Sequence, residues 1–377
     1  MMRTVILAVV MTAAAMLAAA QAPGRLVFIG TYTGADSKGI YAFRFDDRAG
    51  TLAPVGLVAE TPNPSFLTAR DDGKVLFAVN ENSAGADKAG TVTSFAVNDA
   101  TGKLTQLSVQ SSRGADPCHL MLDRSGRFLA VANYSGGSFA VLPVGPDGRL
   151  APATTVLMSE GTGPNRERQE GPHAHEAVFD ASNRFLLGVD LGLDRVHVYR
   201  FDPATGAATP NKPAFAVSAP GAGPRHLVFH PNGRLVFAIN ELNSTIATYT
   251  WNGATGALAP TGASVSTVPA AGAAGNSTAE IAMHPSGQFL YGSNRGHDSI
   301  AVYRVSAAGA LTLVEHEPTR GQTPRNFAID PTGKWLIAAN QKSGTLAVFS
   351  IDSRTGALAP VGPLANVGSP VSIQFLR

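Results

Sequence analysis

One ten-residue pattern recurs along the chain about every fifty residues, and it constrains the fold more than any other feature. A period of this length indicates a repeat architecture. The complete copies read DDGKVLFAVN, RSGRFLAVAN, ASNRFLLGVD, PNGRLVFAIN, PSGQFLYGSN and PTGKWLIAAN, ending at Asn80, Asn133, Asp190, Asn240, Asn294 and Asn340. A seventh copy, LVFIGTYTG, lacks its first half and places Thr31 at the same point. A second signal, a turn followed by a short strand as in ATGALAPTG, also occurs seven times.

Each unit contains the signature of four short strands. Val, Ile, Phe and Tyr alternate with small or polar residues, and Gly, Pro, Asp and Asn bound the runs, as in PRHLVF, GRLVFAIN and STIATYTW. Four strands per unit and seven units predict an all-β fold, a seven-bladed β-propeller with four antiparallel strands per blade around a central channel. The frame Asn and Asp residues are interpreted as turn-formers that bond local backbone.

The two ends of the chain favour a closed ring over an open solenoid, which would need caps. SPVSIQFLR at residues 369–377 matches the first strand of a unit, and LVFIGTYTG matches the second. Together they complete one blade, so N- and C-terminal strands pair to close the ring. We therefore expect residues 21–377 to form a single propeller domain, for which a monomer is sufficient.

Residues 1–20, MMRTVILAVVMTAAAMLAAA, have the layout of a secretory signal peptide, with Arg3 before an apolar run and small residues at the cleavage site. A short membrane anchor is the alternative. We expect a periplasmic or secreted protein that is free of the membrane after cleavage. The whole chain has 29 basic and 27 acidic residues. Because this balance is nearly neutral, we expect no nucleic-acid partner. Cys118 is the single cysteine, which excludes an internal disulfide.

Equivalent positions of the units can be compared as columns, and the charged residues gather in the columns at strand ends. In a propeller these ends lie near one mouth of the channel. His175 and Arg225 occupy the column after the Pro of the first strand, while Glu241 and Arg295 follow the frame Asn. We expect these four residues to form one patch. A network of interblade salt bridges is the structural alternative.

A metal site is not expected. His173 and His175 are two residues apart on a strand, so they would share a face without a third ligand in register. We also expect no cofactor. Two inserts fall outside the repeat frame, at residues 157–172 and 266–279. Such loops often border a site, and ordinary surface insertion is the alternative.

Four motifs carry a resemblance to a known family: GPHAHE followed by VDLGLDRV, GPRHLVFHPNG, NEL, and SNRGHDSIAVY. Over residues 25–377 the chain resembles the bacterial lactonase family of seven-bladed propellers, which includes cycloisomerase-type 6-phosphogluconolactonases and fungal carboxymuconate cyclases. The resemblance implies catalytic roles for His175, Arg225, Glu241 and Arg295, with His173 competing for the His role. Further substrate-binding candidates are His173, His226, His297 and Arg325.

The expected activity is hydrolysis of a sugar lactone, 6-phosphogluconolactonase-like, on a small and anionic substrate. His175 would act as general base on water, Glu241 would orient it or share that role, and the two arginines would bind the anionic group or polarise the carbonyl. A muconate cycloisomerase and a non-catalytic propeller that binds a protein or glycan remain as alternatives.

Overall fold

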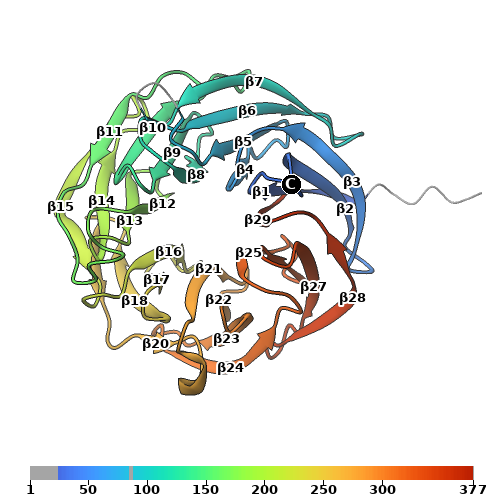
Figure 1. The fold of residues 1–377 in the computed structure, drawn as a ribbon. Helices are drawn as coiled ribbons and strands as arrows, with labels where there is room; N and C mark the ends of the chain where they lie inside the picture. The colour runs from blue at the N-terminus through green and yellow to red at the C-terminus, as the bar shows by residue number, and fades with distance from the viewer. Residues whose placement is uncertain (1–23, 85–87, 377) are drawn as a thin grey trace, which may run out of the picture.

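The computed structural model describes residues 24–84 and 88–376, and in this part of the chain the strands form a ring of seven antiparallel sheets (Figure 1). The strands closest to the central axis are β29 (Pro370–Phe375), β4 (Leu67–Ala69), β8 (Pro117–Leu122), β12 (Ala174–Phe179), β16 (Pro224–Phe229), β21 (Ser277–Met283) and β25 (Pro324–Ile329). Their neighbours are β1 (Arg25–Thr31), β5 (Val75–Asn80), β9 (Phe128–Asn133), β13 (Phe185–Asp190), β17 (Leu235–Asn240), β22 (Phe289–Arg295) and β26 (Trp335–Asn340).

The third strands are β2 (Gly39–Asp46), β6 (Thr91–Val97), β10 (Ser138–Pro143), β14 (Arg195–Phe201), β18 (Thr245–Asn252), β23 (Ser299–Val305) and β27 (Thr345–Ile351). The outer strands are β3 (Thr51–Glu60), β7 (Leu104–Ser111), β11 (Thr155–Met158), β15 (Ala208–Val217), β19 (Ala257–Pro260), β24 (Leu311–Pro318) and β28 (Leu358–Asn366). A short strand, β20 (Val265–Ser266), also pairs with β18, and the 3₁₀ turn η1 (Ala270–Gly272) lies in the second insert.

The predicted seven-bladed propeller and its closure are both confirmed. The C-terminal strand β29 pairs antiparallel with the N-terminal β1, which places Ile373 opposite Ile29 and Phe375 opposite Val27. Sheet order β29-β1-β2-β3 makes this blade from both ends of the chain, as Figure 1 shows where the red and dark blue strands meet. The ring is therefore held shut by backbone hydrogen bonds between residues far apart in sequence.

Apolar packing between neighbouring blades makes up the core. Every residue of β5, β9, β13 and β17 is buried, because these strands have a blade on each side. This explains why the second strand of each unit is an almost continuous apolar run instead of an alternating one. The closing blade is packed the same way: Val27 and Phe375 belong to one apolar cluster with Ile337 of the preceding blade, while Phe28 shares a cluster with Leu76 of the following one.

In five blades the frame Asn or Asp holds the chain that leads into the inner strand, at Asn80, Asn133, Asp190, Asn294 and Asn340. The buried Nδ2 of Asn80 donates to the carbonyl oxygen of Pro62 at 2.7 Å, and Nδ2 of Asn340 donates to Thr319 at 2.9 Å. Asp190 replaces Asn in one blade, and its Oδ1 accepts the backbone N–H of His173 at 2.9 Å. These side chains are therefore structural, but the backbone they bond lies 17 to 27 residues earlier in the chain, so the Asn residues are not the local turn-formers that were predicted.

The predicted signal peptide, residues 1–20, lies outside the described residues and stays a prediction. In the part of the chain that is described, no helix has the length and apolar character needed to cross a membrane.

Candidate functional site

A β-bulge near the start of the inner strand determines where the charged columns point. In β12 the pairing with β13 shifts between Ala174 and Glu176, so His175 is left out of the ladder. The same shift leaves out Cys118 in β8, Arg225 in β16 and Arg325 in β25. A bulge re-aims the extra side chain. The bulges therefore turn this column toward the mouth of the channel, where it meets the column that follows the frame Asn.

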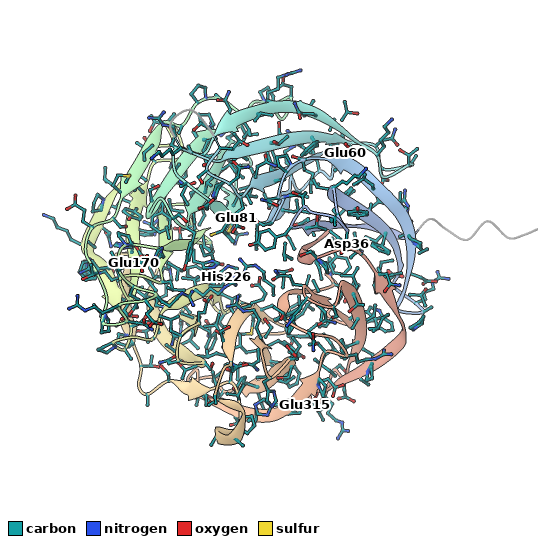
Figure 2. The ribbon with its side chains drawn as sticks, viewed as in Figure 1. Asp36, Glu60, Glu81, Glu170, His226 and Glu315 are labelled. Carbon is teal, nitrogen blue, oxygen red and sulfur yellow. The ribbon has the colours of Figure 1, made fainter. Side chains whose placement is uncertain are left out.

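A cavity of about 340 Å³ opens at this mouth, within the size range of small-molecule sites. We call the residues that line it the cavity layer: Tyr32, Glu81, Cys118, Tyr134, Arg168, His175, Glu241, Ser277, Arg295 and Arg325. They come from several blades and, for Arg168, from the insert at residues 157–172. Figure 2 shows Glu81 at the centre of the ring, whereas Glu60 and Glu315 lie on the outer strands.

Glu241 is paired with three arginines. Its Oε2 lies 2.8 Å from Nη2 of Arg295 and 3.2 Å from Nε of Arg225, and its Oε1 accepts from Nη2 of Arg168 at 2.6 Å. The carboxylate is only 4% exposed. Burial alone would raise its pKa, but Arg295, Arg225 and Arg168 outweigh burial and hold the pKa at about 2. Glu241 is therefore ionised at every physiological pH and is a very weak base.

Two of these arginines are fixed from below by consecutive carbonyls of β21. Nη1 of Arg225 donates to Ala279 at 2.6 Å, and Nη2 of Arg295 donates to Thr278 at 2.7 Å. Arg225 is 2% exposed and does not line the cavity. Its burial, together with Arg325 and Arg295, lowers its pKa to about 10. Arg225 thus lies beneath Glu241, and Arg295 is the member of the pair that faces the cavity.

Arg325 also lines the cavity and has no ion pair of its own. Burial would lower its pKa, but Tyr32, Glu81 and Glu241 outweigh burial and raise it. Its guanidinium is 5.4 Å from the ring centroid of Tyr32 and makes no hydrogen bond or ion pair with any residue of 24–84 or 88–376. The nearby Glu81 is occupied instead, since both of its carboxylate oxygens accept from the Tyr32 hydroxyl at 2.9 Å. Arg325 therefore retains its hydrogen-bonding capacity for a ligand.

His175 is an uncharged imidazole on the wall of the cavity. Its Nδ1 is 3.7 Å from the Sγ of Cys118, and its Nε2 has no hydrogen-bond partner within the described ranges. Burial, and then the positive charges of Arg225 and Arg325, hold the pKa of His175 well below its usual range. The imidazole therefore keeps a lone pair available for a proton at neutral pH.

A second set of side chains joins neighbouring blades, and its members directly follow the column positions Cys118, His175, Arg225, Ala279, Arg325 and Val371. We call this second set the belt: His119, Glu176, His226, Glu280, Asn326 and Ser372, all buried. Figure 2 shows His226 near the axis of the ring. Four belt side chains accept a backbone N–H of the following blade: Glu176 from Leu227 at 2.6 Å, Asn326 from Ile373 at 2.9 Å, Ser372 from Leu67 at 3.1 Å and His119 from Ala177 at 3.4 Å.

The remaining belt pair bonds side chain to side chain, with Nδ1 of His226 3.0 Å from Oε1 of Glu280. Burial raises the pKa of Glu176 and Glu280, and burial lowers the pKa of His119 and His226. Each of these shifts disfavours the charged form. Burial therefore favours the uncharged forms in the belt, which joins the blades next to a charged cavity.

Residues 26–375 match the sequence model of the family described as "Lactonase, 7-bladed beta-propeller". The chain belongs to this lactonase family. A 6-phosphogluconolactonase of Bacillus subtilis is 34% identical over 93% of this chain and 98% of its own. A 6-phosphogluconolactonase of Pectobacterium carotovorum is 38% identical over 74% of this chain and 80% of its own. The solved structure of a Pseudomonas aeruginosa periplasmic gluconolactonase has a TM-score of 0.86 and 35% identity, covering 94% of this chain and 99% of that one.

Membership of the lactonase family confirms the resemblance inferred from the motifs, and the structure brings most of the predicted patch together. His175, Glu241, Arg295 and Arg325 line the cavity, whereas Arg225 supports Glu241 from below. The salt-bridge network considered as the structural alternative is present as well. This network is built around Glu241 at the cavity wall. The ion pairs that join neighbouring blades therefore also fix the guanidinium groups at and next to the cavity.

Three predicted substrate-binding residues lie off the cavity wall. His173 stacks on the Tyr134 ring at 4.5 Å, and its Nε2 is 3.1 Å from Oε1 of Glu170, so His175 is the cavity-lining member of the HAH pair. His226 belongs to the belt. His297 lies beyond the end of β22, where its Nδ1 is 2.7 Å from the hydroxyl of Ser299. Arg295 of the SNRG motif therefore lines the cavity, whereas His297, two residues later, does not.

The structure also brings residues to the cavity that were not predicted as site residues. Tyr32, Glu81 and Tyr134 occupy the column that follows the frame Asn, so the column comparison contained the signal. Arg168 lies in an insert that has no counterpart in other units, and no repeat comparison could have indicated it. Within residues 24–84 and 88–376, no group of three or more His, Cys, Asp or Glu side chains is arranged to hold a metal ion.

Proposed function

We propose that the protein is a lactonase that hydrolyses the ring ester of an anionic sugar lactone of the 6-phosphogluconolactone class. The observation that carries the proposal is the charge of the site. The guanidinium groups of Arg168, Arg295 and Arg325 line the cavity and Arg225 lies just beneath, against the two carboxylates of Glu81 and Glu241. Such an excess of positive charge is costly to bury without a partner. An anionic substrate supplies that partner.

The proposed reaction begins with water held beside His175. The imidazole takes a proton from the water while the water oxygen attacks the carbonyl carbon of the lactone. The electron pair of the carbonyl double bond moves onto the carbonyl oxygen. Arg295 faces the developing oxyanion, while Glu241 fixes the position of the guanidinium. Collapse of the tetrahedral intermediate breaks the bond to the ring oxygen, which recovers the proton from His175. The product is the open-chain aldonic acid, which ionises and releases a proton to solvent.

An anionic substrate also assists the base. Arg225 and Arg325 hold the pKa of His175 low in the free protein, and they disfavour the imidazolium that must form in the reaction. A phosphate or carboxylate bound against Arg325 offsets this positive charge and raises the pKa of His175. Substrate binding would therefore strengthen the base at the moment when it is needed.

An unphosphorylated gluconolactone is the second candidate. The signal peptide predicted at residues 1–20 and the similarity to a periplasmic gluconolactonase both favour it, because phosphorylated sugars are scarce outside the cytoplasm. The same two observations support our proposal that this protein works in the periplasm.

The test is acid release in a pH-stat, after subtraction of spontaneous hydrolysis, with 6-phosphogluconolactone, gluconolactone and a carboxymuconate. Faster turnover of the phosphorylated lactone is expected. Preference for gluconolactone would select the second candidate. Consumption of the muconate without lactone hydrolysis would contradict hydrolysis in favour of a cycloisomerase, and inactivity on all three would favour a binding propeller.

A further inference from the structure

The insert at residues 157–172 is anchored to the propeller by one buried side chain. Gln169 is 0% exposed. Its Nε2 donates at 2.8 Å to both the carbonyl oxygen of Leu191 and Oδ1 of Asp194, and its Oε1 accepts from the backbone N–H of Asn165 at 3.1 Å. A buried amide with these bonds fixes the backbone on which it sits. The neighbouring residue, Arg168, is therefore presented from a fixed position.

Arg168 reaches from the anchored insert to the rim of the cavity. Its Nη2 donates to Oε1 of Glu241 at 2.6 Å and lies 3.3 Å from the hydroxyl of Tyr134. The side chain is 42% exposed. Its Nε and Nη1 make no hydrogen bond with any described residue, although they belong to a side chain that lines the cavity. Arg168 thus has a fixed backbone position, and its Nε and Nη1 remain able to donate hydrogen bonds to a ligand.

Glu241 does not require Arg168 for charge balance. The other carboxylate oxygen, Oε2, already faces both Arg225 and Arg295, at 3.2 and 2.8 Å. A third guanidinium makes the site more positive than the carboxylate can balance. Arg325, which makes no hydrogen bond or ion pair with a described residue, lines the same cavity, so the arrangement complements a bound anionic group.

We propose that Arg168 is a specificity-determining residue that contacts the anionic group of the substrate and distinguishes charged lactones from neutral ones. This inference rests on the proposed function, because it assigns a substrate contact within the same cavity. It also gives the first insert a role, since the repeated blade framework alone does not place a cation at this rim.

The test measures binding and turnover separately. Binding of the hydrolysis products 6-phosphogluconate and gluconate is measured by calorimetry for the wild type, Arg168→Gln, Arg168→Lys and Arg166→Gln. Both products carry the aldonate carboxylate, so a difference between them reports on the 6-phosphate alone. Arg166 is an exposed residue of the same insert and is the matched control. Losing a charge-assisted hydrogen bond is expected to weaken 6-phosphogluconate binding about 10- to 100-fold in Arg168→Gln, with gluconate binding little changed. Arg168→Lys should recover part of the loss, and Arg166→Gln should resemble the wild type.

Equal weakening for both ligands would overturn the inference, because Arg168 would then contact the carboxylate that both ligands share or only support the fold of the site. No change for either ligand would also overturn it. The KM for 6-phosphogluconolactone should rise in parallel with the loss of binding. If Arg168→Gln selectively loses 6-phosphogluconate binding but the wild type hydrolyses no lactone, the proposed function fails while the phosphate contact of Arg168 stands.

Discussion

The cavity layer and the belt are built from adjacent residues of the same strands, yet their bonding differs. His175 and Glu176 are neighbours in β12, and Arg325 and Asn326 are neighbours in β25. Burial disfavours the charged forms of the belt side chains, and they complete hydrogen bonds between blades. In the cavity layer, by contrast, Arg325 and the Nε2 of His175 lack partners in the described chain. Unused bonding capacity, more than charge alone, separates residues that act on a ligand from residues that hold the ring.

The largest effect is expected at the cavity face of the arginine cluster. Arg295→Met removes the guanidinium that faces the developing oxyanion, so kcat should fall about 10²- to 10³-fold. Arg304→Met is the matched control, because Arg304 is an exposed residue of the same blade. Steady-state kinetics on the preferred lactone measures the difference. Equal kcat values for the two variants would remove Arg295 from the reaction.

Glu241→Gln should reduce stability in a pH-dependent way. The pKa of Glu241 is lowered from about 4.5 to about 2, which corresponds to roughly 3 kcal/mol at neutral pH. Because the folded-state pKa is depressed, this stability is present above pH 4.5 and is lost as the pH falls toward 2. Denaturant unfolding of wild type and variant from pH 7 to pH 3 should therefore show a narrowing difference. A constant difference would contradict the assigned charge state.

A belt substitution should lower stability and leave chemistry nearly unchanged. Asn326→Ala removes the acceptor for the buried N–H of Ile373 in the closing strand β29, at a cost of about 1–3 kcal/mol. The melting temperature should fall, and kcat of the folded protein should stay within about twofold. The exposed Asn232→Ala serves as control. A large loss of kcat at an unchanged melting temperature would break the distinction between belt and cavity layer.

The smallest effect is expected at Cys118, which lines the cavity but should not react. Burial raises the pKa of its thiol well above the usual range, so thiolate is absent at neutral pH. Cys118→Ala should leave kcat/KM within about twofold, and iodoacetamide at pH 8 should not inactivate the wild type. Rapid inactivation that the substitution abolishes would show that the thiol is accessible and ionised.

The sequence was sufficient for the fold because the repeat encodes it many times over. Each unit carries its own turn residues and apolar runs, and the terminal segments match the first and second strands, so blade number and closure followed from counting. The columns also indicated the end of the channel where charge gathers. Those inferences depend on strand period and turn chemistry, which are local properties of the chain.

The residues that line the cavity were harder to predict because residues at equivalent bulged positions do not all face it. Arg225 and His175 share a column, yet Arg225 lies under Glu241 while His175 lines the cavity. His226 carries a titratable group and serves the belt. Arg168 comes from an insert outside the repeat, and its position depends on the long-range bonds of Gln169. Such bonds leave no periodic signal in the sequence.

Comparing His175→Ala with Glu176→Ala tests the central claim most directly, because the two residues are adjacent in β12 and belong to different layers. We expect His175→Ala to lower kcat/KM for the preferred lactone about 10²- to 10⁴-fold with little change in melting temperature. Glu176→Ala should lower the melting temperature and keep kcat/KM within a few-fold. The reverse pattern, with activity lost at Glu176 and stability lost at His175, would contradict the assignment of chemistry to the cavity layer and of interblade bonding to the belt.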